Sequence, residues 1–163
     1  MLWHYTIGRC LVQILRDGYI RPARAGVPAG ERPIVWFSQH RDWEPTACKD
    51  VRGPDGTRRT LTKEEMQEMD ALIRIGVERE TAPHDWRALK QLSGMSPKMA
   101  QGLQRSALQQ GARPGDWRGT FENVPQAEWL AVEVLLDERW QSFPAADTAS
   151  RGALAPEMEE PRG

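Results

Sequence analysis

The chain changes its hydrophobic period several times, and this alternation restricts the fold more than any other feature of the sequence. Short runs of apolar, aromatic or β-branched residues have the character of strands, at residues 2–6, 19–22, 34–38, 71–79, 117–121 and 129–136. Between them, apolar residues recur at helical spacing in stretches that begin near residues 7, 62, 86 and 97. Such a mixture predicts an α+β domain, with about six short strands in a split or two-layer sheet and three to four helices.

The length of 163 residues is that of one domain with an ordinary core. Its last part has a different composition, because from Pro144 onward Ala, Pro, Glu, Arg and Gly leave little to bury. We therefore expect a folded α+β domain over residues 1–143 and a disordered tail over residues 144–163.

Charge and spacing exclude several classes of site. With a net charge of −1, the chain as a whole is not attracted electrostatically to nucleic acid or anionic membranes. A basic cluster between Arg52 and Lys63 nevertheless keeps a nucleic-acid partner as an alternative. The two cysteines and three histidines lack the spacings of metal ligands, so we expect no metal. The chain has no signal-like start and no apolar run of the ~20 residues that a membrane span needs. We expect a cytoplasmic protein, or an effector delivered by a specialised export machine.

Several residues predict where helices begin and end. Thr6 is placed to cap the first helix, and Gly18 is placed to end it in a left-handed turn. Thr62 and Glu65 have the spacing of a capping box, and Asp85 precedes a short helix as an N-cap.

Polar side chains inside the predicted strands are the candidate functional residues, because a buried polar group needs a partner or a role. His4 lies in the first strand and Ser38 ends the strand at 34–38. Arg74 interrupts the strand at 71–79, whose other face carries isoleucine and valine. Glu133 stands in the middle of the apolar strand at 129–136, and Glu128 lies just before that strand.

This order of residues resembles the ADP-ribosyltransferase fold superfamily, which places a His or Arg on the first strand, a Ser or Tyr on a middle strand and a Glu on a late strand. The His-Tyr-Thr run at 4–6, followed by an amphipathic helix and Gly18, is similar to the opening of its DNA-modifying and tRNA 2′-phosphotransferase-like branches. The run at 132–136 is similar to the Glu-then-aliphatic strand of bacterial toxins, and residues 126–128 match their Gln-x-Glu spacing. The Trp-Phe-Ser run at 36–38 departs from the Ser-Thr-Ser triplet of the arginine-class enzymes.

The resemblance implies a glycosyltransferase that uses NAD as a substrate and needs no metal. It would be a mono-ADP-ribosyltransferase of bacterial or phage type, toxin-like or effector-like, acting on a protein or nucleic-acid acceptor. Glu133 or Glu128 would stabilise the ribose cation as NAD loses nicotinamide. His4 would donate to the adenosine ribose, an aromatic residue would stack on nicotinamide, and a hydroxyl would bind its amide or a phosphate. The implied NAD-contacting residues are His4, Tyr5, Thr6, Trp36, Ser38, Trp43 and Arg74.

The two glutamates compete for the catalytic role. A strand running regularly back to Gln126 would turn Glu128 toward the core and leave Glu133 on the open face, which favours Glu133. Pro125 makes such a regular strand doubtful, and the toxins carry their glutamate at a strand start, where Glu128 lies.

Structural roles are also possible for each of these residues. For His4 the alternative is a hydrogen bond to a backbone carbonyl, and for Thr6 and Ser38 it is a cap or turn. For Glu133 it is an ion pair with Arg74 across neighbouring strands. Glu44, in the loop after the strand at 34–38, is a further candidate for an active-site acid, although we expect an exposed loop acid there.

A non-enzymatic function remains the alternative. The chain would then be a binding or regulatory α+β module, acting through a surface rich in its seven tryptophans or through the helix pair at 86–110. The enzymatic hypothesis requires that His4, Ser38 and a glutamate meet at one cleft.

Overall fold

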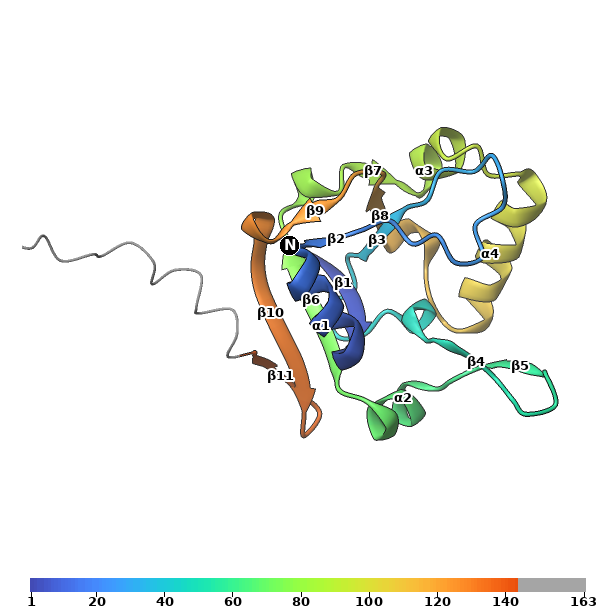
Figure 1. Cartoon of the computed structure of the whole chain (residues 1–163). Coiled ribbons are helices and arrows are strands. Elements are labelled where there is room, and N and C mark those ends of the chain that lie inside the picture. Colours follow the sequence, from blue (N-terminus) through green and yellow to red (C-terminus); the bar gives the residue numbers. More distant parts are fainter. Residues whose placement is uncertain (144–163) are drawn as a thin grey trace, which may run out of the picture.

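The computed structural model describes residues 1–143, which form one α+β domain (Figure 1). The strands are β1 (Leu2–Ile7), β2 (Tyr19–Ile20), β3 (Val35–Ser38), β4 (Asp50–Arg52), β5 (Arg58–Thr60), β6 (Leu72–Val77), β7 (His84–Asp85), β8 (Trp117–Thr120), β9 (Val124–Pro125), β10 (Trp129–Leu136) and β11 (Arg139–Ser142). The α-helices are α1 (Gly8–Asp17), α2 (Lys63–Met69), α3 (Trp86–Leu92) and α4 (Pro97–Gln109). Short 3₁₀ helices are η1 (Pro45–Ala47), η2 (Arg79–Thr81), η3 (Pro114–Asp116) and η4 (Gln126–Glu128). The predicted α+β class is confirmed, and the expected tail lies outside the described residues.

Seven strands form one sheet in the order β11-β10-β6-β1-β3-β8-β7, and every pairing in it is antiparallel. β1 pairs with β6 along its whole length, but it pairs with β3 only between Trp3 and Ser38. The sheet therefore divides at this one residue pair, with β1, β6, β10 and β11 in one half and β3, β7 and β8 in the other.

Two of the buried apolar clusters pack against the sheet near the cavity, and the first of them also includes Val35 and Phe37 of β3. One core holds Leu2, Ile73, Ile75 and Val77 with Leu11 of α1, which confirms the predicted inward face of the strand at 71–79. The second core lies where α3 and α4 gather beside β3 and β8 (Figure 1). Its buried members are Ile34, Trp86, Leu89, Ala100, Ala107, Ala112 and Trp117.

The predicted helix ends are confirmed with one exception. Gly18 has a left-handed φ of 78° and donates its N–H to Ile14 O, as a C-terminal cap should. Thr62 forms the capping box of α2, and Asp85 caps α3. Thr6 does not cap α1, because β1 continues to Ile7 and holds the Thr6 side chain in the sheet.

The sequence missed the strands whose composition is polar. None of the strands predicted from the sequence lies between residues 39 and 70, yet this region contains the β4–β5 hairpin. β11 was missed as well. It follows β10 through a two-residue turn in which Asp137 and Glu138 both have positive φ, the geometry of a type I′ hairpin without its usual glycine.

Candidate functional site

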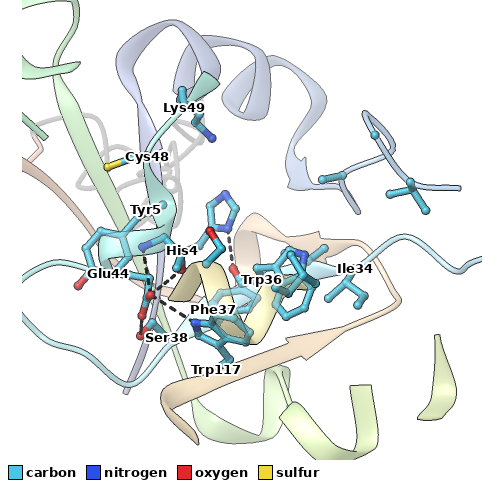
Figure 2. A pocket seen from close by; sticks show the side chains of 18 of the residues that line it. His4, Tyr5, Ile34, Trp36, Phe37, Ser38, Glu44, Cys48, Lys49 and Trp117 are labelled. Carbon is cyan, nitrogen blue, oxygen red and sulfur yellow. Dashed lines mark hydrogen bonds between the residues drawn. The ribbon is translucent and has the colours of Figure 1, made fainter. Parts of the chain in front are cut away.

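A cavity of about 520 Å³ opens where the two halves of the sheet separate (Figure 2). Its walls come from β1, β3, the loop at 21–34, the segment at 44–49 and α4. Four residues from the predicted site line it, namely His4, Tyr5, Trp36 and Ser38. Lining residues that the prediction did not include are Glu44, Thr46, Cys48, Lys49, Met95, Met99, Leu103 and Trp117.

His4 bridges the point at which β1 and β3 part. Its Nδ1 lies 2.9 Å from Trp36 O, and its ring packs at a tilt against Phe37 with 5.7 Å between centroids. The side chain thus binds a carbonyl on the edge of β3 where no further strand pair with β1 forms. The bond to a backbone carbonyl that the sequence left open is present, and His4 also faces the cavity.

The protonation of His4 follows from these contacts. Burial lowers its pKa from the usual 6.5 to about 4, assisted by nearby Lys49 and opposed by the bond to Trp36, so the ring is neutral at pH 7. A carbonyl oxygen can only accept, so Nδ1 carries the hydrogen and Nε2 is a bare acceptor. No partner of Nε2 is found among residues 1–143. His4 Nε2 can therefore accept a hydrogen bond from a hydroxyl of a ligand, whereas the resemblance implied that His4 would donate one.

Ser38 belongs to a buried network centred on Glu44. The Ser38 hydroxyl donates to one Glu44 oxygen at 2.6 Å. The other oxygen accepts from the Thr46 hydroxyl at 2.6 Å, the Thr46 N–H at 3.3 Å and Trp117 Nε1 at 3.3 Å (Figure 2). Glu44 is only 6% exposed, so the expectation of an exposed loop acid was wrong. The Glu-Pro-Thr run at 44–46 carried the missed signal, because an acid before a proline commonly caps a helix start.

The aromatic candidates divide into two groups. Trp36 is half-buried, lines the cavity and packs against Trp86 and Trp117 at centroid distances of 6.3 and 5.8 Å. Tyr5 also lines the cavity, but its hydroxyl donates to His40 O at 2.6 Å and burial raises its pKa. Trp43 packs edge-on against Tyr5 at 5.2 Å and does not line the cavity.

Besides Trp43, four of the predicted residues lie away from the cavity. Thr6 is buried in the sheet, and Arg74 binds Glu133 at 2.5 Å across β6 and β10. The parity argument placed Glu133 correctly, on the face opposite the core residues of β10. Glu128 is exposed in η4, because the regular strand does not extend back to it. The structure therefore brings Glu44 to the cavity, and neither of the two glutamates singled out from the sequence.

Comparison of the chain with protein-family models, with curated proteins and with solved structures found no match. Within residues 1–143, no group of three or more His, Cys, Asp or Glu side chains is arranged to hold a metal ion. In the same part of the chain, no helix is long and apolar enough to cross a membrane.

Proposed function

We propose that the chain binds NAD in the cavity beside β1 and β3 and transfers its ADP-ribose to a protein or nucleic-acid acceptor. One observation carries the proposal: a neutral His4, the half-buried ring of Trp36 and the buried carboxylate of Glu44 surround a single cavity. Its volume lies within the range of sites for small molecules and cofactors. Several apolar walls with a few fixed polar groups are typical of such sites.

The reaction needs a fixed carboxylate beside the ribose, and Glu44 is a buried carboxylate that lines the cavity. The bond between ribose C1′ and the nicotinamide nitrogen breaks, and its electron pair leaves with nicotinamide. The acceptor's nucleophile then bonds to C1′ and loses a proton. A carboxylate stabilises the cationic ribose most effectively when its position is fixed in advance. The hydrogen bonds from Ser38, Thr46 and Trp117 hold Glu44 in this way.

Other lining residues suit the remaining parts of the dinucleotide. His4 Nε2 can accept from a ribose hydroxyl, and Trp36 offers a ring for stacking on nicotinamide. Arg21, Arg32 and Lys49 also line the cavity, and their positive charge favours a diphosphate.

A second candidate function, ligand binding without catalysis, is favoured by the hydrogen bonding of the same glutamate. Glu44 accepts from four donors within the protein, as a purely structural cap would. All seven tryptophans lie within residues 1–143, and none is fully exposed: three are buried and four are half-buried. A partner would more readily meet α3 and α4, whose Leu92 and Leu108 are exposed.

The two functions separate in an assay of nicotinamide release. We expect millimolar NAD to raise the melting temperature of the protein and nicotinamide to be released over time. Glu44→Gln should lower the release rate by roughly 100-fold, as loss of a fixed electrostatic group does in other enzymes. Glu128→Gln is the matched control, because this exposed carboxylate lies outside the cavity and its loss should leave the rate unchanged.

The outcomes are distinct. A thermal shift without nicotinamide release supports the binding function. No shift at millimolar NAD contradicts both NAD-based functions, and an unchanged rate in Glu44→Gln contradicts the role given to that carboxylate.

A further inference from the structure

Three consecutive backbone carbonyls in the loop that leads from β3 to Glu44 are each bound by a side chain from a different strand. Tyr5 of β1 donates its hydroxyl to His40 O at 2.6 Å. Arg74 of β6 donates to Arg41 O. Trp140 of β11 donates its indole N–H to Asp42 O at 2.8 Å. We call these three side chains and the carbonyls that they bind the carbonyl clamp.

Arg74 is the centre of the clamp. Its guanidinium carbon lies 3.9 Å from the ring centroid of Trp3 and 4.5 Å from that of Trp140. Two of its nitrogens face Glu133 at 2.5 Å, which leaves the third for the loop. Only a planar guanidinium can stack between two rings while it donates in two fixed directions. From the sequence, Arg74 was expected to contact NAD or to pair with Glu133, and its bond to the loop was not predicted.

The clamp holds one end of a cavity wall. Glu44 follows the clamped carbonyls after one intervening residue, and the wall continues to Lys49. The far end is held separately, because Leu61 N–H donates to Lys49 O at 2.8 Å. We propose that Arg74 is a positioning residue, and that Tyr5 and Trp140 assist it. Together they hold the segment at 39–49, which includes the cavity wall at 44–49, and thereby fix the carboxylate of Glu44. The effect of the clamp on catalysis by Glu44 rests on the proposed function. Its effect on the position of the wall does not.

Two conservative substitutions test the clamp. Tyr5→Phe removes one hydroxyl and keeps the ring that packs against Trp43. Arg74→Lys keeps the charge beside Glu133 and loses the fork. Tyr19→Phe is the matched control, because the structure gives the Tyr19 hydroxyl no hydrogen bond within residues 1–143.

The first measurement is amide hydrogen exchange in the free protein. Each clamp variant should speed exchange over residues 39–49 by roughly fivefold, the factor expected for the loss of one net hydrogen bond. Exchange over α3, which contacts β7, β8 and η3 and not the clamp, should rise less than exchange over 39–49, which separates a local loosening from a general loss of stability. Unchanged exchange at 39–49 in both variants, or an equal rise in the Tyr19→Phe control, would overturn the clamp.

The second measurement separates positioning from a merely structural role. Arg74→Lys should slow nicotinamide release about tenfold, because small displacements of a reacting group reduce the rate strongly. The NAD concentration at half-maximal rate should change by less than about twofold, since His4 and Trp36 lie on β1 and β3 and Lys49 is held at the far end of the wall by Leu61. Faster exchange with an unchanged release rate overturns the positioning of Glu44. Absence of NAD binding by the unsubstituted protein instead refutes the proposed function, and the exchange result still decides the clamp.

Discussion

Acidification should destabilise this protein through His4 in a definite pH window. The folded protein holds the pKa of His4 at about 4, whereas the unfolded chain restores the usual 6.5. Between these two values the unfolded chain binds the extra proton, so folding becomes less favourable as the pH falls. The whole shift corresponds to about 3 kcal/mol, and the step from pH 7 to pH 5 accounts for about 2 kcal/mol of it.

The assay compares the protein with His4→Asn, whose side-chain amide can still donate to Trp36 O but does not titrate. Urea unfolding of both proteins at pH 7 and pH 5 yields two free-energy differences, in which the titration of His40, His84 and the carboxylates cancels. The free energy of unfolding of the unsubstituted protein, relative to that of His4→Asn, should be about 2 kcal/mol lower at pH 5 than at pH 7. If this difference in the free energy of unfolding is the same at both pH values within about 0.5 kcal/mol, the argument that burial keeps His4 neutral is refuted.

Two further predictions concern stability. Arg74→Met should destabilise the fold by about 3 kcal/mol, because Glu133 loses its partner. Removing both charges should restore part of this loss, which a double-mutant cycle measured by urea unfolding can detect. Strictly additive losses would mean that the two charges do not stabilise each other. Gly119→Ala should lower the free energy of unfolding by at least about 2 kcal/mol, because the added Cβ would lie 3.0 Å from Val35 O. Gly102→Ala, on the open surface of a helix, should raise it by about 1 kcal/mol. Equal melting temperatures of the two variants would contradict this packing argument.

The main helices and strands could be predicted from the sequence, because the residues that specify each of them are close together in the chain. The period of the apolar residues predicted β1, β6 and β10, and the capping residues Thr62 and Asp85 marked where two helices begin. The cap predicted at Thr6 failed because the pairing of β1 with β6 continues past it. Polar strands such as β4, β5 and β11 carry no such period, since their partners and not their composition decide that they are strands.

The candidate site divides in the same way. His4, Trp36 and Ser38 were recognised because a polar or aromatic side chain in a strand is visible in the sequence, and the structure places all three at one cavity. Glu44 was missed because its burial arises from contacts with distant Trp117 and neighbouring Thr46. Glu133 was overvalued, because a carboxylate in a strand looks the same in the sequence whether it faces a ligand or an arginine.

The sequence by itself determined the α+β class, the order of the main strands and helices, and which face of each long strand is apolar. These properties follow from side-chain periodicity and backbone preferences within a few residues. Only the tertiary structure decided which carboxylate reaches the cavity and that Arg74 holds a loop. Both depend on where β1 and β3 separate and on which residues from distant parts of the chain fill the gap. Such contacts join residues far apart in the chain, for example Trp140 and Asp42, which are separated by 98 positions, and no local pattern encodes them.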